Sequence, residues 1–72
     1  MIVKLKGTNC LQDPKYISLI LARHNAIIKK VRYRMINSVV FTINIENWDC
    51  LNEIIVDIYE NTSYGVIIKS VR

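Results

Sequence analysis

The sequence has little of what catalytic and metal sites require. Its 72 residues include one histidine, two glycines and two cysteines. Gly7 and Gly65 are too far apart to form a glycine-rich phosphate loop. Cys10 and Cys50 lack the Cys-x-x-Cys spacing of zinc and redox sites, and His24 has no other ligand residue at metal-binding spacing. We therefore expect no metal, no cofactor and no enzymatic activity.

Long apolar runs are also missing. No stretch of about 18 apolar residues is present, so the sequence predicts no membrane span and no membrane partner. Met1–Gly7 alternates between apolar and basic residues and is too short for a signal peptide. Without a secretion signal, the two cysteines are expected to be reduced thiols in a cytoplasmic protein.

Apolar residues are nevertheless abundant, at 51% of the chain. This content predicts a packed core rather than disorder. A chain of 72 residues is expected to form one domain, residues 1–72. Because a domain this small buries a limited part of its surface, pairing with a second copy would add stability, and we expect a homodimer.

Residues 27–45 predict a β-hairpin around which the other elements are organised. Side chains alternate between the two faces of a strand, and from residue 30 to residue 35 apolar side chains alternate with cations. A turn at residues 37–38 is favoured because asparagine tolerates a positive φ angle. Tyr33 and Phe41 fall on the apolar face and are predicted to be core. The apolar face of the second strand consists of Val39, Phe41, Ile43 and Ile45.

A strand and a helix precede this hairpin. Ile2–Lys6 alternates as a first strand, which is predicted to break at Gly7–Asn9. Asp13-Pro14 marks a helix start, with aspartate as N-cap and proline in the first turn. The helix extends to about His24, which we interpret as a packed or capping group, and Asn25 ends it.

A second helix and a last strand follow the hairpin. The helix opens at residues 46–49, capped by Asn47 or Asp49, and ends at Asn61–Gly65. Its predicted buried residues are Trp48, Leu51, Ile55 and Ile58. The residues spaced for water are Asp49, Asn52, Glu53, Asp57 and Glu60. Val66–Val71 forms the last strand, for which strict alternation places Val66 and Ile68 inward and Ile67, Lys69 and Val71 outward.

The order of these elements is strand, helix, strand, strand, helix, strand. The right-handed crossover rule converts this order into one arrangement. We predict an α+β, ferredoxin-like βαββαβ fold: a four-stranded antiparallel sheet with two helices on one face. The first and third strands should be central and the second and fourth should be edges.

Basic residues gather on the open face of this predicted sheet. Six of the ten basic residues are expected there: Lys4, Lys6, Lys30, Arg32, Arg34 and Lys69. Five of the six acids lie in or just before the second helix: Glu46, Asp49, Glu53, Asp57 and Glu60. A net charge of +4 understates this separation, and a clustered field steers partners. We expect an anionic partner, either an acidic protein surface or a nucleic-acid backbone.

The same cations also have a purely structural interpretation. Lysine is common on edge strands, where it prevents pairing between sheets. RNA-recognition motifs share this topology but stack bases on aromatics of the two central strands. The corresponding open-face positions here are Lys4, Lys6, Val40, Thr42 and Asn44. Base stacking on the sheet is therefore not expected, whereas backbone binding stays open.

The layout resembles the ACT domains and the RAM domains of Lrp-type regulators. The residues that carry the resemblance are Asp13-Pro14, the helix after them, and Asn25–Ile28 leading into the second strand. The resemblance implies a regulatory plait that dimerises. Lys15 stands where ACT domains carry the glycine at which a ligand approaches, so amino-acid binding is not carried over.

Four functions are compatible with these observations, the fourth of which is a small-molecule sensor of the ACT type. The first is a non-catalytic binding or regulatory module that acts through protein–protein interaction, using its basic sheet face and self-association. The second is a nucleic-acid backbone binder, whose affinity would depend strongly on salt. The third is a viral or mobile-element inhibitor of a host complex, which a free-standing, non-catalytic domain rich in isoleucine, asparagine and lysine would suit.

Overall fold

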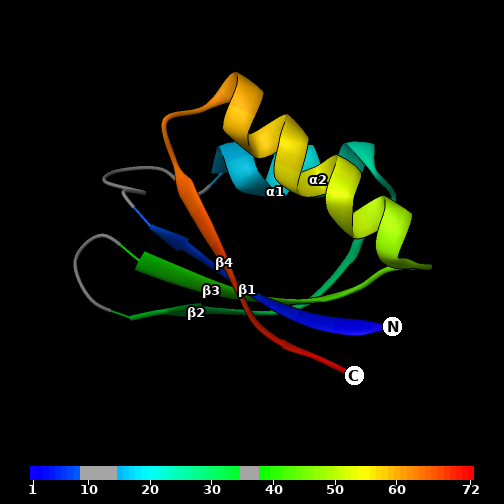
Figure 1. Cartoon of the computed structure of the whole chain (residues 1–72). Helices are drawn as coiled ribbons and strands as arrows, with labels where there is room; N and C mark the ends of the chain where they lie inside the picture. Colours follow the sequence, from blue (N-terminus) through cyan, green and yellow to red (C-terminus); the bar gives the residue numbers. More distant parts are fainter. Residues whose placement is uncertain (9–14, 35–37) are drawn as a thin grey trace.

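The computed structural model describes residues 1–8, 15–34 and 38–72. Its elements are β1 Ile2–Thr8, α1 Lys15–Arg23, β2 Ile27–Tyr33, β3 Ser38–Asn44, α2 Trp48–Asn61 and β4 Gly65–Val71. The strands form one antiparallel sheet in the order β2-β3-β1-β4. Both helices lie on the same face of this sheet (Figure 1). The predicted ferredoxin-like fold is confirmed, with β1 and β3 central.

The core lies between the sheet and the two helices. In β1 the buried residues Val3 and Leu5 alternate with the exposed Lys4, as the sequence pattern predicts. The inward residues predicted for the second strand of the hairpin are also buried: Val39, Phe41 and Ile43 in β3, and Ile45 just after it. The buried apolar cluster consists of Val3, Leu5, Ile17, Ile20, Leu21, Val39, Phe41, Ile43, Ile45, Leu51, Ile54 and Ile58. Apolar burial of this kind fixes the orientation of the sheet, and the opposite face is left to solvent.

Local hydrogen bonds set the end of α1 and the start of α2. Asn25 adopts φ 58°, the left-handed conformation expected of a residue just after a helix. The Ala26 N–H then donates to the Leu21 carbonyl oxygen at 3.0 Å, which satisfies a carbonyl of the last turn. Asn47 is the N-cap of α2, and its side chain accepts from the Cys50 N–H at 2.9 Å. The alternative cap, Asp49, lies one residue inside the helix.

A β-bulge in β4 corrects the predicted alternation of the last strand. The register of β4 shifts opposite Lys4 and Leu5, and Lys69 is the extra residue. Beyond a bulge, each side chain points to the face of the sheet opposite to the one that strict alternation would give it. Val71 therefore pairs with Val3 and packs against the core instead of pointing outward.

The buried stripe of α2 also differs from the prediction. It is formed by Leu51, Ile54 and Ile58. At 100° per residue, Trp48 and Ile55 lie together on one flank of that stripe. Trp48 is consequently 57% exposed, and Ile55 is only partly buried. Both were predicted to be core, whereas Ile54, which has no exposed surface, was missed.

The edge strand β2 is less covered than predicted. All of its residues are exposed, and Tyr33, predicted to be core, is 68% exposed. Tyr33 does face the helix side of the sheet, as predicted, since it pairs with the inward residue Val39. Facing the helix side of the sheet therefore does not by itself bury the ring. Near the N-terminus, β1 does not break at Gly7 as predicted but continues to Thr8. The helix start expected at residues 13–14 lies outside the described residues.

Candidate binding site on the open sheet face

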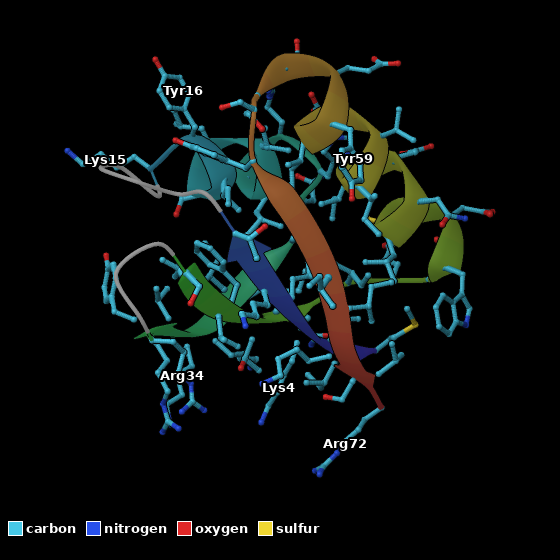
Figure 2. All side chains as sticks on the ribbon, turned by 60° about the vertical axis from the view of Figure 1, so that its left-hand side comes forward. Lys4, Lys15, Tyr16, Arg34, Tyr59 and Arg72 are labelled. Carbon is cyan, nitrogen blue, oxygen red and sulfur yellow. The ribbon has the colours of Figure 1, made fainter. Side chains whose placement is uncertain are left out.

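A hollow of about 100 Å³ lies on the sheet face opposite the helices. Its lining comes from all four strands and comprises Lys4, Lys30, Arg32, Arg34, Val40, Thr42 and Lys69. Figure 2 shows Lys4 and Arg34 pointing away from the helices, whereas Tyr16 lies on the helix side. Five of the six cations predicted to share this face therefore surround one depression. We call this set of lining residues the basic hollow.

Strand register explains why the surface is hollow. One cross-strand row places Thr42 of β3 between Lys30 of β2 and Lys4 of β1. The next row places Val40 between Arg32 and Lys6. In both rows a small uncharged β3 side chain separates two long cationic ones. Lys4, Lys30 and Arg32 therefore stand as walls around a low floor. No two cations face each other directly across a strand pair in these rows, which would be destabilising.

The remaining predicted cations occupy different positions on this face. Lys6 has the outward register but does not line the basic hollow. Lys69 is the bulged residue of β4 and lines it from the opposite edge to β2. Lys6 thus extends the positive surface beyond the hollow without forming its wall.

Arg72 is an additional cation on this face that the sequence pattern missed. Its N–H donates to the Ile2 carbonyl oxygen at 2.7 Å, and its carbonyl oxygen accepts from the Ile2 N–H at 2.9 Å. Figure 2 shows its side chain pointing away from the helices. Strict alternation would have turned residue 72 inward, and only the bulge at Lys69 brings it out. No sequence signal marks that bulge.

Within residues 1–8, 15–34 and 38–72, no acid forms an ion pair with a cation of the basic hollow. The ion pairs of Arg23 and His24 with Asp57 and Glu53 lie on the helix side. The hollow is also smaller than the roughly 300–1,000 Å³ of a typical small-molecule pocket. Lysine ammonium groups and arginine forks at its rim can donate charge-assisted hydrogen bonds to carboxylate or phosphate oxygens. The geometry suits anionic groups displayed on a larger surface better than an enclosed cofactor.

A second polar cluster joins the two helices at His24, whose side chain is 20% exposed. Its Nε2 lies 2.9 Å from Oδ2 of Asp57, and its Nδ1 lies 3.8 Å from a carboxylate oxygen of Glu53. Asp57 is also approached by Arg23 at 3.6 Å and accepts from the Asn61 side chain at 2.6 Å. Sequence spacing within one chain segment could not reveal these partners, because α1 and α2 meet only in the folded protein.

The chemistry of this cluster is structural in character. The hydrogen bond from His24, assisted by the positive charge of Arg23, holds the pKa of Asp57 below its ordinary value of 3.8. Asp57 is thus partly buried and paired, not a solvated carboxylate as predicted, while Glu53 remains largely exposed. Cys50 donates its thiol hydrogen to the main-chain oxygen of His24 at 3.5 Å, not to the imidazole. No group of three His, Cys, Asp or Glu residues suited to a metal ion occurs within 1–8, 15–34 and 38–72.

Comparisons with protein-family models, with curated proteins and with solved structures find no match for this chain. Within the part of the chain that the structure describes, no helix is long and apolar enough to cross a membrane. Cys10 lies outside the described residues, and Cys50 is a free thiol. The candidate site therefore rests on the basic hollow and its charge.

Proposed function

We propose that the protein is a non-catalytic binding module that docks an acidic protein surface on its open sheet face. The observation that carries this proposal is the convergence of five cations on one hollow without compensating acids among the described residues. Carboxylates of a partner would enter between Lys4, Lys30, Arg32 and Arg34. Clustered charge of one sign raises the association rate and selects partners of opposite charge.

Apolar groups beside the cations favour a protein partner. Ile67, in the same cross-strand row as Lys6, is 54% exposed, whereas Val40 in the floor of the basic hollow is almost completely buried. Protein interfaces combine apolar contacts with charged rims, whereas nucleic-acid backbones offer chiefly phosphates. The basic hollow contains no aromatic residue among those described, so a nucleic acid would have no base-stacking platform there.

A nucleic-acid backbone is the second candidate, supported by the same density of cations. It predicts a specific salt dependence. If each of the five cations contacts one phosphate of a duplex, the slope of log K against log salt is about −4 to −5. The resemblance to ACT and RAM domains adds the expectation of a regulatory role, which we keep as part of this proposal rather than as a separate activity.

The proposal is tested by measuring binding of poly-glutamate and of generic duplex DNA at about 50 mM and about 200 mM NaCl. Arg32→Glu alters the wall of the basic hollow, and Lys15→Glu makes the same charge change on the helix side, where Figure 2 places Lys15. We expect poly-glutamate to bind in a salt-sensitive way and Arg32→Glu to weaken it more than Lys15→Glu. Equal loss in both variants, or no binding at the lower salt, would refute a specific anionic site. Tight binding of DNA alone would favour the second candidate.

A further inference from the structure

The edge of β2 exposes main-chain hydrogen-bonding groups. The Arg34 N–H donates to the Ser38 carbonyl oxygen at 3.1 Å, so these two residues form a hydrogen-bonded pair. Bonded pairs alternate along an antiparallel ladder, and Arg32 therefore also directs its N–H and C=O toward β3. Val31 and Tyr33, between these positions, direct theirs away from β3. Among the described strands, β2 has no neighbour on that side.

The side chains of β2 present two chemically different rows along this edge. On the helix side, Ile28, Val31 and Tyr33 pair with inward residues of β3 yet are 36%, 39% and 68% exposed. On the open-face side, Lys30, Arg32 and Arg34 line the basic hollow. An added strand would therefore meet an apolar row on one face and a cationic row on the other.

The other edge of the sheet is less available to a partner strand. At β4 the Tyr59 hydroxyl donates to the Val66 carbonyl oxygen at 3.4 Å, and Figure 2 shows Tyr59 beside this strand. The bulge at Lys69 interrupts its register in the middle of the strand. In β2 the irregularity lies between Ile28 and Lys30, so the ladder from residue 30 to residue 34 is continuous. A strand of about five residues can pair there without crossing a bulge.

Charge decides which strand fits the edge of β2. A second copy of β2 would place cations opposite cations, which is unfavourable across a strand pair. The five acids in or just before α2 are on the far layer of this chain and cannot supply the complement. We infer that β2 accepts an added antiparallel strand from a different protein, in which acidic residues alternate with apolar ones. This inference rests on the proposed function and names the form of its acidic partner.

Pairing geometry places the acids where they act best. The positions opposite Val31 and Tyr33 become hydrogen-bonded pairs with the added strand, because these residues direct their main chain outward. The positions opposite Arg32 and Arg34 become non-hydrogen-bonded pairs, in which side chains approach more closely. Carboxylates there meet the guanidinium groups, while apolar side chains of the partner cover Val31 and Tyr33. Main-chain bonds supply affinity and the alternating side chains supply specificity, as in other cases of strand addition.

The test uses three synthetic peptides: one that alternates glutamate with valine, an isomer of the same composition with its glutamates clustered, and an alternating peptide with N-methyl groups on its valines. We expect the alternating peptide to bind, the clustered isomer to bind at least tenfold more weakly, and N-methylation to weaken binding more than tenfold by removing main-chain donors. Arg32→Glu together with Arg34→Glu should weaken the alternating peptide about tenfold or more. Bound peptide should slow amide hydrogen exchange at Val31 and Tyr33 but not at Val66 of β4, whose N–H also points away from its partner strand.

A proline variant tests the same edge from the protein side. Val31→Pro removes an N–H that faces away from β3, so the β2–β3 ladder keeps its donors, and proline is tolerated at edges of this kind. It should abolish binding of the alternating peptide but leave poly-glutamate binding intact. If this variant does not fold by circular dichroism, the N-methylated peptide on the unaltered protein decides. Binding of poly-glutamate without preference for the alternating peptide would overturn the strand inference and leave the proposed function standing, whereas failure of every acidic probe would overturn both.

Discussion

Replacement of Ile54 by alanine gives the sharpest test of the packing. Ile54 has no exposed surface and lies at the centre of the buried stripe of α2. Truncation of a buried isoleucine to alanine costs about 2–5 kcal/mol. At about 0.05–0.15 kcal/mol per residue, a chain of 72 residues has a total stability of about 4–11 kcal/mol. Ile54→Ala should therefore remove a large share of the free energy of unfolding and lower Tm by at least about 8 °C.

Matched variants on the same helix make this prediction specific. Val56 is 51% exposed, so Val56→Ala should change stability by less than about 0.5 kcal/mol. Ile55 is partly buried, and Ile55→Ala should fall between the other two. Urea denaturation followed by far-ultraviolet circular dichroism is the assay, because Trp48 is 57% exposed and its fluorescence would report the core poorly. If Ile55→Ala cost more than Ile54→Ala, the assigned stripe of α2 would be wrong.

Three further predictions concern the helix end, the interhelical cluster and self-association. Asn25 has φ 58°, so Asn25→Ala should destabilise the protein by about 1 kcal/mol in urea denaturation while Asn25→Gly should not; equal effects would contradict a strained left-handed position. Because its partners hold the pKa of Asp57 below 3.8, the stabilisation from this carboxylate is complete above that pH and is lost as pH falls through the lowered pKa. Asp57→Asn should therefore flatten the acid side of the pH–stability curve, and an unchanged curve would exclude this contribution. A homodimer formed by pairing open sheet faces should strengthen in sedimentation experiments as salt screens its cations, whereas a dimer that weakens with salt must use another surface.

The basic sheet face and the acidic helix layer lie on opposite sides of the molecule, and this separation of charge affects how a partner would approach. The helix-side acids are partly neutralised by Arg23 and His24, whereas the cations of the basic hollow have no acidic partner among the described residues. The electrostatic potential is therefore most strongly positive on the open sheet face. An acidic strand would be drawn to the open face first and would form main-chain bonds at β2 afterwards, so ionic strength should change the association rate more than the dissociation rate.

Most of the candidate site could be predicted from the sequence because strand alternation is local. Lys4, Lys30 and Arg32 needed only the period-two pattern and the strand order to be placed together. Only the register between the strands shows that these residues line one hollow with Val40 and Thr42 as its floor. Arg72 could not be found, because its outward position depends on a bulge that no residue type announces.

The sequence by itself determined the element order, the ferredoxin-like topology, the inward faces of β1 and β3, and the helix signals at Asn25 and Asn47. These depend on backbone preferences and on residue spacing within a segment, which the chain carries locally. Only the tertiary structure decided that Tyr33 and Trp48 stay exposed and that Asp57 pairs with His24. Burial depends on whether another element covers a residue, and ion pairs depend on which parts of the two helices meet. Both are properties of packing between distant segments, so no local pattern could determine them.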